Sequence, residues 1–357
     1  MSEKPYTKGR GAQINPANRF LKLRQEVDVE HQSSNEEREA LLNENPATKY
    51  LDVFPKTIIN KVESTDLPDY SLNPYQGCEH GCVYCYARNT HEYWGFSAGA
   101  DFEQNILVKR NAPELLRKTL ADPKWKADLI MMAGNTDIYQ PIERKLKITR
   151  ELLEVFWKFR HPVGMITKNS LIERDIDILE KLASENLVNV LLSLTTLDEQ
   201  LKRKLEPRTS SAKNILKTIE TLTNRGIPVR VLTAPIIPSI NDHEIHALVK
   251  AVADAGALGV SYQVVRLNGQ VAMLFEDWLN KNFPDRANKV LNQIRSVHGG
   301  QLNDSRFGVR MRGEGLWADM IRKQFKLATQ AYLKDRKIPS LNFELHDQFK
   351  GGQMRLF

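Results

Sequence analysis

Six short apolar runs, separated by longer amphipathic stretches, constrain the fold of this chain more than any other feature. The runs are typical of buried strands and lie at residues 71–76, 129–133, 163–167, 188–195, 229–234 and 260–266. The stretches at 144–159, 173–183, 212–222 and 243–255 repeat apolar residues at three- and four-residue steps, as amphipathic helices do. Strands that alternate with helices favour right-handed crossovers and a parallel sheet. The pattern fits an α/β fold with six β/α units, either a partial barrel or a doubly wound open sheet.

The composition divides the 357 residues into three parts. Residues 1–48 are polar and charged, so we expect a partly disordered N-terminal segment, with a possible helical piece at 36–42. Residues 49–270 contain the six β/α units. Helical patterns at 273–282, 286–297 and 316–336 predict a C-terminal extension, residues 271–357, packed on the barrel.

All three cysteines of the chain lie within eight residues, as Cys78, Cys82 and Cys85. Three thiolates can hold three irons of a [4Fe–4S] cluster and leave the fourth iron open to bind a small molecule. The alternative is a structural Cys3His zinc site with His80 or His91 as the fourth ligand. Zinc sites usually take cysteines in paired C-x2-C units, and the sequence has no second pair. The odd count disfavours disulfides.

The C-x3-C-x2-C spacing, with the aromatic Tyr84 before the third cysteine, resembles the signature of the radical S-adenosylmethionine (SAM) superfamily. Around it, Asn73-Pro74-Tyr75-Gln76-Gly77 and Tyr86-Ala87-Arg88 resemble the spore photoproduct lyase-like branch, also called DNA repair photolyase-like. Further matching segments lie at 134–137, 166–168, 205–208 and 235–242, so the resemblance covers about residues 50–357.

This resemblance implies a partial (β/α)6 TIM-like barrel with a C-terminal helical extension, a [4Fe–4S] cluster on Cys78, Cys82 and Cys85, and SAM on the open iron. It implies reductive cleavage of SAM to a 5′-deoxyadenosyl radical, which abstracts hydrogen from an unidentified substrate. An electron donor such as flavodoxin or ferredoxin is implied as a partner. The catalytic residues of the substrate reaction stay unknown.

Polar side chains follow several of the expected strands, where parallel barrels gather their reactive groups. We expect SAM contacts from Tyr84, Asn135, Thr136, Asp137, Lys168, Ser193 and Arg208. The turn at 134–137 would meet the amino group of the methionine part, although Asn and Asp also cap helices. Lys168 and Arg208 would meet its carboxylate, and Ser193 the carboxylate or ribose. The alternatives are that Lys168 is an ordinary surface lysine, that Ser193 is a satisfied buried hydroxyl, and that Arg208 forms a structural pair with Glu206 or another acid. Residues 229–238 would form a wall for adenine or simply core.

One departure from the branch bears on the reaction. Spore photoproduct lyases carry an extra cysteine after the second strand, which returns a hydrogen atom to the product radical. The matching residue here is Gly134, and all three cysteines are committed to the motif. Tyr86, Tyr139 or Tyr262 could relay hydrogen instead, and the sequence singles out none of them. We therefore do not expect repair of thymine dimers by that route.

The net charge of +7 favours either a basic solvated surface or an anionic partner such as nucleic acid. Basic residues are scattered except at 306–312. The aromatic-rich residues 91–96 could shield the cluster, stack on a base or pack in the core.

The start, Met1-Ser2-Glu3-Lys4, is unlike a signal peptide, and no apolar run approaches the roughly 20 residues that cross a bilayer. These features predict a reducing cytoplasm and no membrane partner. The alternative function is a basic nucleic-acid-binding module with a structural metal site and no catalysis.

Overall fold

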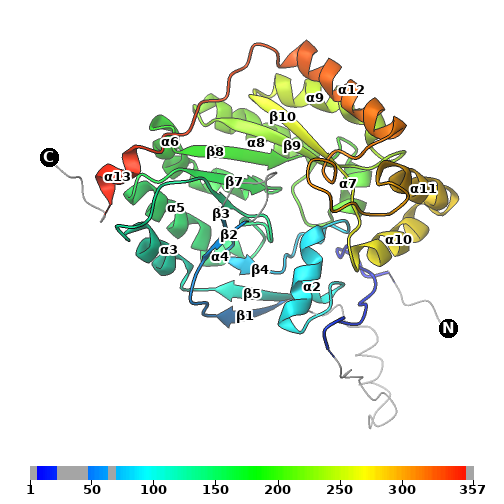
Figure 1. Ribbon diagram of the computed structural model, residues 1–357, viewed down its shortest axis with the longest axis horizontal. Helices are drawn as coiled ribbons and strands as arrows, with labels where there is room; N and C mark the ends of the chain where they lie inside the picture. The colour runs from blue at the N-terminus through cyan, green and yellow to red at the C-terminus, as the bar shows by residue number, and fades with distance from the viewer. Residues whose placement is uncertain (1–5, 22–46, 63–69, 351–357) are drawn as a thin grey trace, which may run out of the picture.

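The computed structural model describes residues 6–21, 47–62 and 70–350 (Figure 1). Its main sheet has seven strands in the order β10-β9-β8-β7-β6-β3-β2. The six parallel strands are β3 (Tyr70–Leu72), β6 (Ile130–Met132), β7 (Val163–Thr167), β8 (Val188–Ser193), β9 (Val229–Ile236) and β10 (Gly259–Val264). Strand β2 (Ile59–Lys61) runs antiparallel to β3 at one edge.

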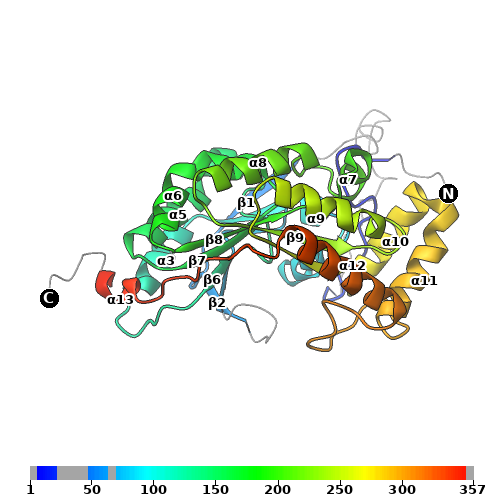
Figure 2. The same ribbon diagram turned by 90° about the horizontal axis from the view of Figure 1, so that it is seen from above.

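The parallel strands follow one another in sequence order across the sheet. A doubly wound sheet reverses its strand order at a switch point, which this sheet does not do. The arrangement confirms the predicted partial (β/α)6 barrel. Figure 2 shows α5 (Ile148–Lys158), α6 (Ile176–Ser184) and α8 (Ala212–Asn224) along one face of the sheet.

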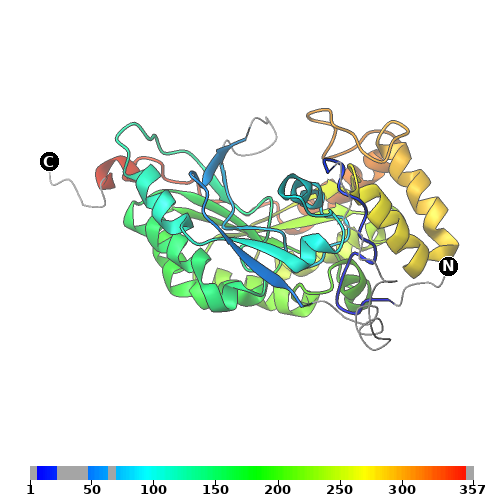
Figure 3. The ribbon, with the colours of Figure 1, turned by 90° about the horizontal axis from the view of Figure 1, so that it is seen from below.

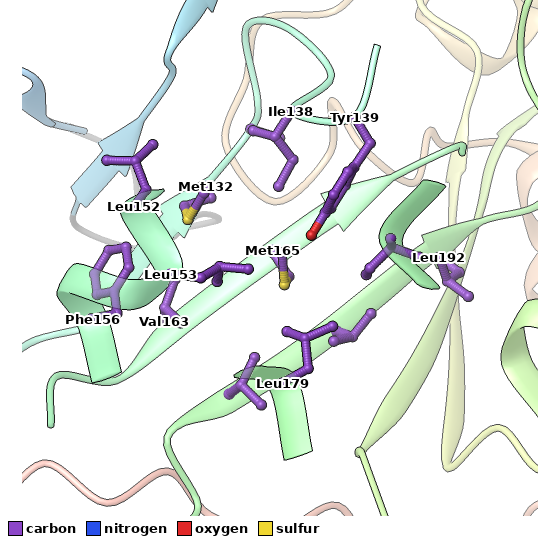
Figure 4. Close-up of a cluster of buried hydrophobic side chains, with 14 of the residues drawn as sticks. Met132, Ile138, Tyr139, Leu152, Leu153, Phe156, Val163, Met165, Leu179 and Leu192 are labelled. Carbon is purple, nitrogen blue, oxygen red and sulfur yellow. The ribbon is translucent and has the colours of Figure 1, made fainter. Parts of the chain in front are cut away.

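The core forms where these helices meet the strands. Leu152, Leu153 and Phe156 of α5 are fully buried against Val163 and Met165 of β7 (Figure 4). Burying each such side chain contributes roughly 1.5–3 kcal/mol, so the amphipathic face that the sequence displays is what docks the helix. The same packing fixes the end of β7, from which Lys168 projects.

Two predicted elements differ from the observed ones. The predicted strand at 71–76 is broken, because Pro74 has no N–H for the ladder. After β3 the chain enters a second sheet, β1-β5-β4, made of β1 (Lys49–Val53), β5 (Asn105–Lys109) and β4 (Tyr75–Gln76). The predicted helix at 144–159 is split into α4 (Glu143–Leu146) and α5 by Lys147, which adopts the left-handed conformation with φ 56°.

Other helices complete the chain around the sheet. Short α2 (Asp101–Gln104), α3 (Ala112–Leu120), α7 (Glu199–Leu205) and α9 (Ile245–Asp254) lie between strands. After β10 come α10 (Val271–Asn282), α11 (Ala287–Val297), α12 (Leu316–Tyr332) and α13 (Leu345–Phe349). Helices α10 and α11 bury Phe275, Trp278 and Ile294 in a cluster that includes Val83 of the cysteine motif. Helix α12 packs on β10 and α9 through Phe325 and Ala328.

The N-terminal segment is described only in part. Residues 6–21, dark blue in Figure 3, pass beside the yellow helices α10 and α11, and the Gln270 side chain donates to the Ala17 carbonyl at 3.0 Å. The helical piece predicted at 36–42 lies outside the described residues. Among the described residues, no helix has both the length and the apolar character needed to cross a membrane.

Candidate active site

One cavity lies at the carboxyl ends of the parallel strands, and all three cysteines line it. Cys78 and Cys82 are buried and Cys85 is partly exposed. The carboxyl-terminal parts of β6 to β10 and the residues just after them supply the remaining walls, including Asn135 after β6 and Lys168 after β7. The topology therefore brings together groups separated by more than a hundred residues of sequence.

The cysteine loop, residues 77–85, is held at both ends by backbone hydrogen bonds. Cys78 N donates to the Phe102 carbonyl at 2.9 Å, and Val83 N donates to the Leu205 carbonyl at 3.1 Å. Gly81 has a φ of +70°, and a Cβ there would lie 2.9 Å from a carboxylate oxygen of Glu103. Glycine is therefore needed where the loop turns against its surroundings.

Burial raises the pKa of all three thiols, so without metal they carry protons. A metal that binds them displaces these protons. Three sulfurs on one cavity, with no other cysteine in the chain, match the donor set of a cluster with one open iron. The donor chemistry thus fits a [4Fe–4S] cluster.

The two histidines considered as zinc ligands have other partners. His80 Nδ1 lies 3.3 Å from an Asp137 oxygen, and its Nε2 lies 3.2 Å from the Asn169 amide nitrogen. His91 stacks on Phe96 with ring centroids 5.0 Å apart, and burial lowers its pKa to about 4. His91 is also not among the cavity-lining residues. His80 thus lies between Asp137 and Asn169, and His91 is packed away from the cavity.

The turn at 134–137 lines the cavity but is also tied to neighbouring elements. Asn135 donates its side-chain amide to Gln76 and accepts from Thr90 Oγ1 at 2.9 Å. Thr136 Oγ1 donates to the Gly77 carbonyl at 2.7 Å, at the start of the cysteine loop. The turn therefore fixes the loop as well as facing the cavity.

Asp137 joins the cysteine loop to the end of β7. It accepts from Thr167 Oγ1 at 2.7 Å, Lys168 N at 2.8 Å and Tyr139 N at 2.8 Å. Burial by itself would raise the pKa of this carboxyl, but His80 and these donors hold it below its usual value. Asp137 is thus an ionised carboxylate that links the cysteine loop to the end of β7, and most of its hydrogen-bond acceptor positions are occupied.

Lys168, Ser193 and Tyr84 meet over a buried carboxylate, Glu206. Lys168 Nζ donates to Ser193 Oγ and to Glu206 Oε1, both at 3.0 Å. Tyr84 OH also donates to Glu206, and Lys202 Nζ lies 2.5 Å from its other oxygen. Burial would raise the pKa of Glu206, but the two lysines hold it far below its usual value. Two cations around one anion leave an excess positive charge beside the cavity.

Arg208 is not among the residues that line the cavity, so its contact with a cofactor carboxylate stays a prediction. Its Nε donates to the Gly9 carbonyl at 3.0 Å, and its Nη1 lies 3.6 Å from Glu79. The N-terminal residues that accept from it gave no signal in the sequence. The guanidinium on the cavity belongs to Arg266, whose Cζ lies 5.8 Å from the Tyr86 ring centroid. Its position at the end of an expected parallel strand was the signal that could have found it.

Of the three tyrosines named as hydrogen relays, Tyr86 lines the cavity and the other two do not. Tyr86 OH donates to the Gly134 carbonyl. Tyr139 is buried with its OH 3.0 Å from Asp175, and Tyr262 stacks on Phe325 at 4.1 Å between ring centroids. From the apolar segment 229–238, Leu232, Ala234 and Pro235 face the cavity.

Comparison with known proteins agrees with this geometry. The sequence profile of the radical SAM superfamily matches residues 72–252. An uncharacterized protein of Mycobacterium tuberculosis is 32% identical over 248 residues, which cover 68% of this chain and 73% of the relative. A protein named radical SAM Nalpha-GlyT isomerase, from Pseudomonas phage M6, is 26% identical over 223 residues, 62% of this chain and 44% of that protein.

Among solved structures, spore photoproduct lyase complexed with dinucleoside spore photoproduct superposes with a TM-score of 0.59 at 14% identity, covering 79% of each chain. A mutant of the same lyase gives a TM-score of 0.60 at 15% identity, again over 79% of each chain. At this level of identity the likeness concerns the fold.

Proposed function

The chain belongs to the radical SAM superfamily and is an enzyme, and on that basis we propose that Cys78, Cys82 and Cys85 hold a [4Fe–4S] cluster beside a SAM site in the cavity. When bound and reduced, the cluster supplies the electron that cleaves SAM to a 5′-deoxyadenosyl radical, which abstracts hydrogen from the substrate. The observation that carries this proposal is the convergence of three cysteines, Lys168 and Ser193 on one cavity.

The protein's own residues bind and orient SAM. The ammonium of Lys168, positioned by Ser193 and Glu206, pairs with the methionine carboxylate. Asn135, Thr136 and Asp137 form the side of the cavity that meets the amino group of the methionine part. Tyr84 is positioned by the hydrogen bond that its hydroxyl donates to Glu206. Leu232, Ala234 and Pro235 exclude water from the adenine. Arg266, which lines the cavity, supplies a further cation beside the SAM site.

The substrate proposed is a nucleic acid. A second hollow, between β10 and α12, is lined by Arg312, Arg322 and Lys326 together with Ser261, Thr329 and the apolar or aromatic Val260, Tyr262 and Phe325. Arg322 is paired with Asp319 at 2.7 Å. Strand β10 contributes residues to both hollows, and we propose that a polymer held at the second places one unit in the first. Backbone phosphates are bound by clustered Arg and Lys of this kind.

In this protein, no cysteine is left to return a hydrogen atom to the substrate or product radical. Gly134 stands where spore photoproduct lyases have their extra cysteine, and the nearest atom to a Cβ built there is the Tyr86 hydroxyl at 3.8 Å. Tyr86 is thus the hydroxyl nearest to that position.

The catalytic groups of the substrate step are unassigned. The electron donor, such as flavodoxin or ferredoxin, and the cytoplasmic location stay predictions. The alternative of a non-catalytic binding module is not carried forward, because the superfamily is one of enzymes.

The test is anaerobic reconstitution with iron and sulfide, followed by reduction and assay of 5′-deoxyadenosine from added SAM. Wild type, Cys85→Ala and the exposed control Ser184→Ala are compared. We expect iron, sulfide and product from wild type and control and loss of product in Cys85→Ala. Zinc in place of iron, or product formation by Cys85→Ala at the wild-type rate, would contradict the proposal.

A further inference from the structure

We propose that residues 9–19, here called the strap, lock the cysteine loop in its cluster-binding conformation, with Glu103 as the positioning residue that joins the two. This inference rests on the proposed cluster site. It assigns a role to an N-terminal segment whose polar composition gave no reason to expect burial. Yet Arg10 and Ala12 are each only 3% exposed.

Glu103 is a fully buried carboxylate at the centre of this contact. Its oxygens accept from Gly11 N at 3.0 Å and Ala12 N at 2.8 Å, both in the strap. On its other side it pairs with Arg88 at 2.5 Å, and Arg88 Nε donates to the Cys82 carbonyl at 2.9 Å. A chain of charge-assisted hydrogen bonds therefore runs from the strap to the backbone of a cluster cysteine.

The strap also touches the cysteine loop directly. A Cβ added at Gly11 would lie 1.6 Å from the Gly81 carbonyl oxygen, so the two backbones are in direct contact. The φ of Gly11 lies outside the left-handed region, and the backbone itself would accept alanine. Only the close approach to Gly81 requires glycine at this position.

Contacts on both sides of Gly11 hold the rest of the strap. Gly9 O accepts from Arg208 Nε at 3.0 Å, and the Arg208 N–H donates to the His80 carbonyl within the cysteine loop at 3.3 Å. Pro16 O accepts from Ser97 Oγ at 2.5 Å, and the Asn18 amide donates to Glu92 O at 2.8 Å. The strap is thus bound along its length to several segments that follow the cysteines in the chain.

These contacts explain how a short loop with two left-handed glycines keeps three sulfurs in place. Most of them are hydrogen bonds, and detaching the strap would remove the Gly11 and Ala12 N–H donors from the buried carboxylate of Glu103. The loop cannot open toward solvent at Gly81 without displacing the strap. We therefore expect the strap to slow the opening of the loop and, with it, the loss of iron.

Full-length Gly11→Ala tests this, with Lys8→Ala as a control, because Lys8 lies next to the strap with an exposed side chain. Glu103→Gln, with the exposed Glu114→Gln as its control, is the second pair. Two quantities are measured: the rate of iron loss from reconstituted protein to excess chelator, and amide hydrogen exchange of residues 78–88 in cluster-free protein. Exchange in β7 reports whether the barrel itself has been loosened.

We expect both rates to rise about tenfold or more in Glu103→Gln, the effect of losing a charge-assisted hydrogen bond, with β7 unchanged. We expect a similar rise in Gly11→Ala, because the added Cβ would displace the strap from Gly81. Rates equal to those of the controls, or equal acceleration in β7 and the loop, would overturn the proposal. If Gly11→Ala does not fold, Glu103→Gln decides. If wild type takes up no cluster, the proposed function fails, and the exchange measurement still decides the role of the strap.

Discussion

At the residue scale, Glu206 determines the charge of the cavity. It is 1% exposed and binds Lys168 on one oxygen and Lys202 on the other. Lys202 is itself only 2% exposed. The cost of burying these charges is offset because each has a partner at hydrogen-bond distance. Removing the carboxylate would leave two lysines facing each other with no compensating charge.

Glu206→Gln should therefore lower the free energy of unfolding by about 3–5 kcal/mol, the range for breaking one side of a buried ion pair. The measurement is urea unfolding at neutral pH. Asp254→Asn, which breaks an exposed pair with Lys250, is the control and should change little. Equal effects of the two substitutions would contradict the assigned role of Glu206.

Lys168 offers a second prediction at this scale. Lys168→Gln removes the ammonium that faces the cavity and keeps a side chain of similar length, so the dissociation constant for SAM should rise about tenfold or more, as when a hydrogen bond to a charged group is removed. Equilibrium binding to cluster-loaded protein measures it. Lys181→Gln, on the exposed side of α6, serves as the control. An unchanged dissociation constant would remove Lys168 from the SAM site.

At the element scale, α13 is joined to the barrel by two neutral histidines. His161 accepts at Nε2 from Trp125 Nε1 at 3.0 Å, and its Nδ1 lies 2.9 Å from the Pro162 carbonyl. His346 on α13 meets the His161 ring edge-on, with centroids 4.8 Å apart. Burial and the neighbouring His346 lower the pKa of His161 to about 3. A second proton would place two donors, on Trp125 and His161, against each other.

This arrangement predicts a loss of stability in acid. The unfolded chain takes up a proton at His161 near pH 6.5 and the folded chain only near pH 3, so the stabilisation is present above 6.5 and is lost as the pH falls through this window. From pH 7 to 5.5 the loss is about 1 kcal/mol. Urea unfolding of wild type and His161→Phe should show their difference shrinking by that amount. A constant difference would contradict the titration.

The same scale shows why some elements were predictable and others were not. Strand β7 was predicted with its observed bounds, because a strand that is buried for most of its length is largely apolar. The break at Pro74 was visible in the sequence, whereas the left-handed Lys147 was not, since nothing local marks it. For the site, residues at strand ends were found because topology alone places them. The strap, Glu206 and the true position of Arg208 depend on contacts between distant segments, which no local pattern encodes.

At the scale of the whole molecule, the main sheet is open. Strand β10 forms one edge, and its outer face is covered by α12 through Tyr262 and Phe325. Tyr262 lines the basic hollow and Arg266 lines the cavity. The extended chain between these two residues is only about 13 Å long. A closed barrel would admit only small molecules. At its cavity end, β10 is bonded through Val264 N to the Met311 carbonyl at 2.9 Å, and the cations of the basic hollow lie beside it. We expect a polymer whose reacting unit enters the cavity while neighbouring phosphates stay outside at these cations.

This geometry predicts a salt-dependent affinity for single-stranded oligonucleotides that the basic hollow controls. Arg312→Ala with Lys326→Ala should weaken binding and reduce the slope of log K against log salt by about 1 for each phosphate that the variant no longer binds. Lys250→Ala, which removes an exposed lysine of α9, is the control. Fluorescence anisotropy over a salt series measures both quantities. If the double variant keeps the wild-type slope, the phosphates lie elsewhere, and the open edge beside β10 admits a different class of substrate.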